Sequence, residues 1–319
     1  MNQVKGNAPL VDMERVIGRL FADPKVVSRL RRDYALKSPA SDPASLANEL
    51  VKSFGQVSEL SPTAERSVDN DTVFRAAVRA VASNNRSWST FLRFESELES
   101  QLGGYKATET NAAVLAEELS IPDLRAYLPG QSGTADASAI IKWAALLADV
   151  PDYYRALTDL ARRLVKTGIS EAEVVPAVAA VLGHPTKRME QLWPPPDRLR
   201  SWKTPGMGPI LASEFLRNLQ WSAFKPDRHI QRLFDLWFDD VVEDYEEEAV
   251  DLAAAIGSRS GSVTKFLKFS LVGLAVTPPD RSPTEVDNLV WALGSYVEKR
   301  RKESSVSYRV QARRRVARD

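Results

Sequence analysis

The 319-residue chain has 44% hydrophobic residues, enough to bury a substantial core in one large or two ordinary domains. The absence of cysteine excludes disulfides and thiolate metal sites, and two histidines are too few for a zinc site without carboxylate ligands. The net charge of +1 does not by itself indicate a nucleic-acid partner, so the distribution of charge along the chain matters more than its sum.

The first residues, MNQVKG, lack the apolar core of a signal peptide, and no apolar run approaches the length that crosses a bilayer. We therefore expect a cytoplasmic protein without a membrane partner. Residues 38–45 are rich in Ser, Pro and Asp, so we expect residues 1–66 to form a peripheral helical extension. A helical core over 67–300 and a basic tail over 301–319 would complete the chain.

Apolar residues recur at helical spacing through most of the chain, and no segment alternates as a half-buried strand does, so we expect an all-α fold. The clearest helix is predicted over residues 71–81, where Phe74, Ala77, Val78 and Val81 form one apolar stripe. Further helices are predicted over residues 86–102, 137–148, 152–166 and 171–182.

Residues 203–219 (KTPGMGPILASEFLRNL) combine a glycine turn with the start of an apolar helix. Gly206 and Gly208 can adopt positive φ and let a ligand approach the backbone closely, and Pro209 suits the first position of a helix. The N–H groups at the start of a helix have no acceptor within it, so this turn predicts an anion site. Lys203 flanks the turn.

A second polar segment, residues 225–230 (KPDRHI), follows shortly after the glycine turn. It places Asp227 at the start of the next predicted helix, where the partial positive charge of a helix N-terminus favours an ionised carboxylate. Lys203, Lys225 and Arg228 are natural phosphate partners, although solvated surface charge is an equally ordinary interpretation. His229, two residues after Asp227, is not on the same helical face and is expected to pack.

The glycine turn, the apolar helix and the Pro-Asp-x-His sequence, in this order, resemble the helix-hairpin-helix superfamily of DNA glycosylases over residues 203–234. The resemblance implies a two-lobed helical fold, a hairpin of Gly206 and Gly208 that grips a DNA phosphate, and Asp227 as the catalytic carboxylate facing the sugar of an extruded nucleotide. It further implies a monomeric enzyme that acts on double-stranded DNA containing a modified or damaged base and needs no cofactor.

Two departures from the family pattern refine this expectation. Members that cut the strand through a Schiff base carry a lysine two residues after the second hairpin glycine, where this chain has Ile210. Because a hydrocarbon cannot be a nucleophile, the resemblance implies hydrolysis of the N-glycosidic bond without lyase activity. The absence of cysteine excludes an iron–sulfur cluster, which leaves the cluster-free branches resembling 8-oxoguanine or alkyladenine glycosylases.

The polar corner of Asn84, Asn85 and Arg86 resembles the Asn-rich turn that 8-oxoguanine glycosylases insert into the gap left by a flipped nucleotide. Asn84 or Asn85 could hydrogen-bond the estranged base while Arg86 meets phosphate. The alternative is that Ser83 and Asn84 cap the helix predicted to begin near Arg86.

Other interpretations stay open. The chain could be a non-catalytic helix-hairpin-helix DNA-binding protein, or a helical interaction module whose glycines only permit close packing. The acidic run over 239–251 is expected to be a solvated helix face, and the basic residues over 299–318 either a disordered terminus or a non-specific DNA contact. Trp88, Trp202 and Trp221 are expected to pack in the core, unless one stacks on the flipped base.

Overall fold

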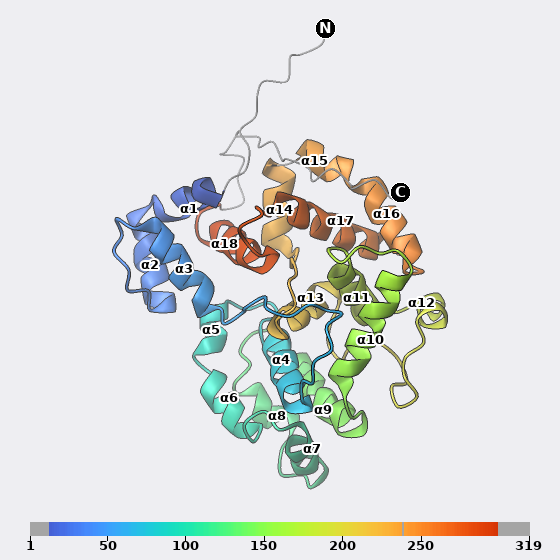
Figure 1. Ribbon diagram of the computed structural model, residues 1–319. Helices are drawn as coiled ribbons and strands as arrows, with labels where there is room; N and C mark the ends of the chain where they lie inside the picture. Colours follow the sequence, from blue (N-terminus) through green and yellow to red (C-terminus); the bar gives the residue numbers. More distant parts are fainter. Residues whose placement is uncertain (1–12, 238, 299–319) are drawn as a thin grey trace. The chain divides into compact units, whose positions relative to one another are not determined.

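The computed structural model describes residues 13–237 and 239–298 (Figure 1). Its regular elements in this part of the chain are all α-helices, and the only β contact there is an isolated bridge between Leu60 and Trp221. The all-α expectation is therefore confirmed. No helix within the described ranges is long and apolar enough to cross a membrane.

The chain divides into two compact units. The terminal unit consists of the described residues within Met1–Val57, Ala223–Leu252 and Thr264–Asp319, and the central unit of Ser58–Ser222 and Ala253–Val263. The expected division at residues 66 and 300 differs from this one, because α1 and α3 pack against α18 near the other end of the chain. The basic tail expected over 301–319 lies outside the described residues.

The terminal unit is built around α18, which begins at a capping box formed by Ser282 and Glu285 and buries Leu289 and Leu293. α1, α3 and α14 contact α18. Its helices are α1 (Met13–Phe21), α2 (Pro24–Tyr34), α3 (Pro43–Ser53), α14 (Arg228–Trp237), α15 (Asp239–Asp244) and α18 (Pro283–Tyr296), with most of α16 (Glu246–Ala255) and α17 (Gly261–Val276).

The central unit is built around α4, α11 and α13. α13 packs against both α4 and α11, and α11 is buried along its whole length because its sequence, VVPAVAAVLG, is entirely apolar. Its helices are α4 (Asn70–Ala82), α5 (Trp88–Leu92), α6 (Glu95–Gln101), α7 (Ala107–Leu115), α8 (Ile121–Arg125), α9 (Gly133–Asp149), α10 (Tyr153–Lys166), α11 (Val174–Gly183), α12 (Lys187–Leu192) and α13 (Pro209–Asn218).

Most of the helices predicted from the sequence are present within a few residues of their expected bounds, as α4, α9, α10 and α11. The helix predicted over 86–102 is instead two helices, α5 and α6. Arg93 and Phe94 form a turn between them, and Phe94 is the N-cap residue of α6. The cap of α5 is Ser87, whose side chain accepts a hydrogen bond from the Thr90 N–H, so Ser83 and Asn84 do not cap this helix.

Candidate functional site

The two glycines of the glycine turn, in the central unit, differ in their conformation and surroundings. Gly206 has a φ of +71°, and a Cβ there would lie 2.4 Å from the Cβ of Ala139 on α9. Gly208 is extended (φ −89°, ψ −179°), and a Cβ there would meet nothing within 4 Å. Only Gly206 therefore needs to be glycine for the fold, whereas Gly208 is exposed and borders open space.

The turn is fixed to the helices around it. The Thr204 N–H and hydroxyl both donate to the Leu182 carbonyl at the end of α11, at 3.1 and 3.0 Å. The indole N–H of Trp143, on α9, donates to the Pro205 carbonyl at 3.1 Å. Met207, between the two glycines, is buried. These contacts hold the backbone of the turn in one position.

Gly208 is the N-cap residue of α13 and offers no side chain to its first turn. Its carbonyl accepts the Ala212 N–H at 2.9 Å, and Pro209 supplies no N–H. The N–H groups of Ile210 and Leu211 belong to the first turn, which has no acceptors within the helix. An exposed, uncapped helix start beside a rigid turn has the polarity to hold an anion.

The helix that precedes this turn in the sequence is α12, which ends at Leu192, and the segment from there to Pro209 contains turns but no helix. Glu190 fixes the end of that segment, because its Oε1 accepts from the Ser201 hydroxyl and the Trp202 N–H at 2.5 and 3.1 Å. α13 packs mainly against α11 and α4, rather than against α12, the helix that precedes the turn in the sequence.

Lys203 contacts the backbone rather than solvent with its ammonium group. Its Nζ donates to the carbonyl of Gly183, at 2.6 Å, and to that of Met207. Burial lowers the pKa of this ammonium, although the residue as a whole is exposed. Lys203 thus joins the end of α11 to the glycine turn. Its predicted contact with phosphate would require the ammonium to leave these carbonyls.

Asp227, in the terminal unit, caps the start of α14 through one of its two carboxylate oxygens. Oδ1 accepts from the N–H groups of His229 and Ile230 at 2.7 and 3.1 Å. Oδ2 has no hydrogen-bond partner in the described part of the chain. The residue is half-buried. The carboxylate is therefore held in a fixed direction while one oxygen stays available.

The segment around Asp227 is attached to α18. The Lys225 N–H donates to Oδ1 of Asp287, a buried residue of α18, at 2.8 Å. The ring of His229 packs edge-on against Trp291, with centroids 6.2 Å apart. Arg228 is exposed. The neighbours of Asp227 thus include one exposed cation and two residues whose contacts hold the segment on α18.

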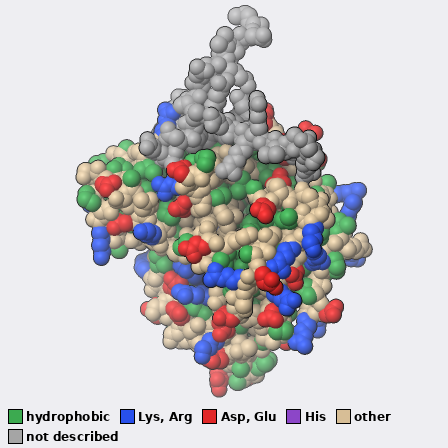
Figure 2. All heavy atoms as spheres, viewed as in Figure 1, with side chains coloured by type: hydrophobic (Ala, Val, Ile, Leu, Met, Phe, Trp, Pro, Cys, Tyr) green, Lys and Arg blue, Asp and Glu red, His purple; other side chains and the backbone are tan. Residues whose placement is uncertain are grey.

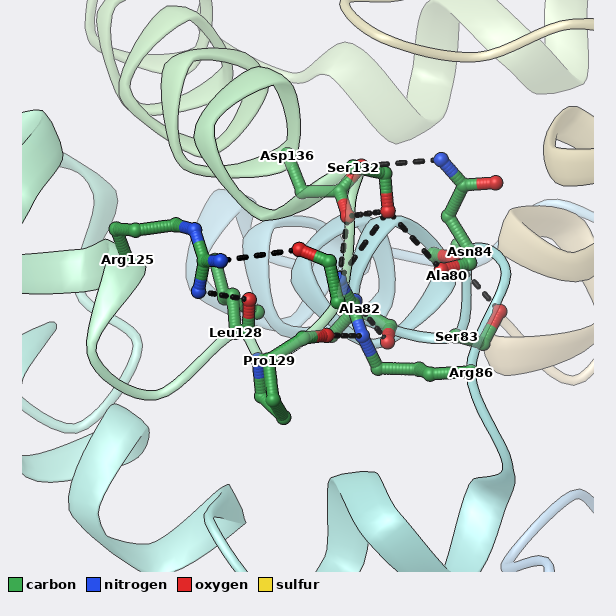
Figure 3. A network of polar contacts seen from close by, with 11 residues as sticks. Ala80, Ala82, Ser83, Asn84, Arg86, Arg125, Leu128, Pro129, Ser132 and Asp136 are labelled. Carbon is green, nitrogen blue, oxygen red and sulfur yellow. Dashed lines mark hydrogen bonds and ion pairs between the residues drawn. The ribbon is translucent and has the colours of Figure 1, made fainter.

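The corner predicted to contact DNA is part of an internal polar network (Figure 3). The Arg86 side chain is only 5% exposed and forms an ion pair with Asp136 at 2.6 Å. Its Nε donates to the Pro129 carbonyl at 3.1 Å, and its Nη1 to the Ala82 carbonyl. Asn84 also bonds Asp136, with Nδ2 3.1 Å from Oδ1.

These bonds show that Arg86 has a structural role, because its guanidinium donates hydrogen bonds to protein acceptors on several sides. Its contact with phosphate is not supported by this geometry. Asn85 differs: it is exposed and adopts the left-handed conformation (φ +53°), which Asn tolerates better than most residues. Among the three corner residues, Asn85 is the one whose side chain could reach a ligand without breaking the network.

The three tryptophans near the motifs are core residues. The indole N–H of Trp202 donates to the Trp193 carbonyl at 2.6 Å, and the indole N–H of Trp221 donates to the Tyr154 hydroxyl at 2.9 Å. Trp88 is buried against Phe91. Core packing is the expected role, and none of them offers a free face for a base in this structure.

Asp136 and Asp287 are structurally important residues that the sequence reasoning missed. Both are almost fully buried carboxylates in helices whose other residues are mostly apolar. Because a buried carboxylate needs hydrogen-bond donors, an acidic residue on an apolar helical face is the signal that could have identified them.

In comparisons with protein-family models, curated proteins and solved structures, no match to the chain was found.

Proposed function

We propose that this chain is a DNA glycosylase that hydrolyses the N-glycosidic bond of a modified or damaged base, with Asp227 as its catalytic carboxylate. The observation that carries the proposal is the state of Asp227, whose Oδ1 is fixed by two N–H groups while Oδ2 has no partner in the described residues. Positive charge develops on the sugar as a base leaves, and a preoriented carboxylate stabilises that charge. Asp227 could also orient the attacking water.

The glycine turn supports a contact with the DNA backbone. It presents an exposed Gly208, free space beside that residue and an uncapped start of α13. A phosphate needs close access to backbone N–H groups, which a side chain at this position would obstruct. The glycine turn belongs to the central unit and Asp227 to the terminal unit. The proposed role of each is argued from contacts within its own unit.

The same residues favour hydrolysis over strand cleavage. Ile210, at the position where lyase members of the family carry lysine, has no amine. The nearest lysine in the turn is Lys203, whose ammonium bonds the Gly183 and Met207 carbonyls. An amine engaged in this way has to break two hydrogen bonds before it can attack a sugar carbon.

The proposal is tested by incubating the protein with duplexes that each contain one modified base, then treating them with alkali to reveal abasic sites. We expect cleavage after alkali for at least one duplex. If no duplex is cleaved but the protein binds DNA with a strong dependence on salt, the chain is a non-catalytic DNA-binding protein. If it neither cleaves nor binds, the glycine turn serves packing alone.

A further inference from the structure

The central unit contains a polar cleft of about 250 Å³ that the proposed glycosylase activity does not use. It lies between residues 65–68 and one face of α10, and is lined by Glu65, Arg66, Ser67, Val68, Asp152, Arg155, Thr158 and Arg162. The α10 residues recur at intervals of three or four, so they share one side of the helix. The volume limits any ligand of this cleft to a small molecule or group.

Both ends of the loop that covers this helical face are anchored. At one end, Nε of Arg162 donates to the Thr63 carbonyl at 2.9 Å. At the other, Nδ2 of Asn70 donates to the Leu147 and Val150 carbonyls at 2.7 and 2.8 Å, and its Oδ1 accepts from the Tyr153 N–H at 3.3 Å. The cleft is therefore formed by the fold and does not require a ligand to shape it.

Three guanidinium groups line the cleft. Arg66 has no ion-pair partner in the described part of the chain, and Arg155 has only Asp159, at 4.0 Å. Arg162 bonds Thr63 and Asp159, so it contributes mainly to the wall. Two guanidiniums with little or no internal partner, in one small cleft, match a group with several anionic oxygens, and arginine binds phosphate through paired N–H groups.

Two carboxylates also line the cleft. Glu65 and Asp152 accept no hydrogen bond with their side chains in the described part of the chain. Asp152 is the N-cap residue of α10, in the left-handed conformation (φ 56°), and its side chain makes no capping hydrogen bond. A ligand with only anionic oxygens would be repelled by these carboxylates, whereas hydroxyl groups would donate to them. The lining therefore favours a ligand that has both anionic oxygens and hydroxyl groups.

We propose that this cleft binds a small phosphate monoester that carries hydroxyl groups, such as a sugar phosphate or a nucleotide. Arg66 and Arg155 would bind the phosphate oxygens, and Glu65 and Asp152 would accept hydrogen bonds from the hydroxyl groups. The site is independent of Asp227 and of the glycine turn.

The test is calorimetric titration of the full chain with ribose 5-phosphate, with ribose and inorganic phosphate as partial ligands. We expect ribose 5-phosphate to bind about tenfold more tightly than either part, and Arg66→Ala and Arg155→Ala each to weaken its binding about tenfold. Arg93→Ala is the matched control, since Arg93 is exposed, lies in the same unit and is absent from the cleft.

Equal affinities for ribose 5-phosphate and inorganic phosphate would show that Glu65 and Asp152 do not contribute to binding, and would overturn the proposal. So would the absence of saturable binding, or an unchanged affinity in Arg66→Ala and Arg155→Ala. If an unmodified DNA duplex displaces ribose 5-phosphate, the phosphate recognised is that of the DNA backbone, which also contradicts a small-molecule site. Asp227→Asn should bind ribose 5-phosphate as the unaltered chain does, so failure here is distinguishable from failure of the glycosylase assignment.

Discussion

The glycine turn illustrates how two residues of one type can have separate physical roles. Gly206 has a backbone conformation that favours glycine and lies against Ala139, whereas Gly208 has an ordinary extended backbone beside open space. A change at Gly206 therefore tests the fold, and a change at Gly208 tests access to the backbone.

We predict that Gly208→Val leaves the protein folded but weakens binding to all DNA duplexes by a similar factor, because the branched side chain blocks a phosphate. Gly206→Ala should instead lower the free energy of unfolding by about 1–3 kcal/mol, from left-handed strain and the contact with Ala139. Denaturant unfolding and fluorescence anisotropy measure the two effects. A loss at Gly208→Val restricted to one modified base would assign this residue to base recognition, contrary to the proposal.

The side chain of Ile210 leads to a second prediction at the residue scale. The protein should leave intact abasic strands and should not be trapped on DNA by borohydride, because no amine occupies this position. Denaturing gels reveal both strand cleavage and a covalent adduct. Recovery of an adduct that disappears in Lys203→Ala would identify Lys203 as the amine and would disprove the monofunctional mechanism.

At the scale of elements, the connection between α4 and α5 depends on the buried ion pair of Arg86 and Asp136. Its side chains are 5% and 4% exposed, and Asn84 and Ser132 bond the same carboxylate. Without Arg86, the carboxylate of Asp136 stays buried with two neutral donors and no opposite charge. We predict that Arg86→Met lowers the free energy of unfolding by about 3–5 kcal/mol.

Asn85→Gly is the control for this prediction, because Asn85 is exposed, lies outside the network and is left-handed, a conformation that glycine adopts without strain. It should change stability by less than about 1 kcal/mol. Denaturant unfolding measures both variants. If Arg86→Met retained normal stability and lost only DNA affinity, Arg86 would be a phosphate contact and the structural assignment would be wrong. A loss of base release in Asn85→Gly, at normal stability, would support the predicted insertion of this corner into DNA.

At the scale of the whole molecule, the sequence predicted those helices whose positions follow from the local spacing of apolar residues and from proline and glycine. The apolar stripe of α4 and the proline and glycine that begin α13 are local signals, and both helices are present. The packing of α1 against α18, the partners of Arg86 and the carbonyls bonded by Lys203 depend on contacts between distant segments. Apolar periodicity carries no information about which distant group a polar side chain meets.

The charge distribution belongs to the same scale. On the face shown in Figure 2, basic and acidic side chains are interspersed, and no region of a single sign dominates it. This pattern agrees with the net charge of +1. In the proposed DNA complex, affinity would come from a few positioned groups, such as the backbone N–H groups at the start of α13, rather than from a broad basic surface.

The measurement that tests the glycosylase assignment most directly compares base release by the unaltered chain and by Asp227→Asn, under single-turnover conditions, on a duplex from which the unaltered chain releases the base. The side-chain oxygen of asparagine can still accept hydrogen bonds from the N–H groups at the start of α14, so the fold is preserved while the charge is removed. We predict that base release falls about a hundredfold or more, with DNA affinity nearly unchanged. Base release by Asp227→Asn at a rate near that of the unaltered chain would contradict the assignment of Asp227 as the catalytic carboxylate.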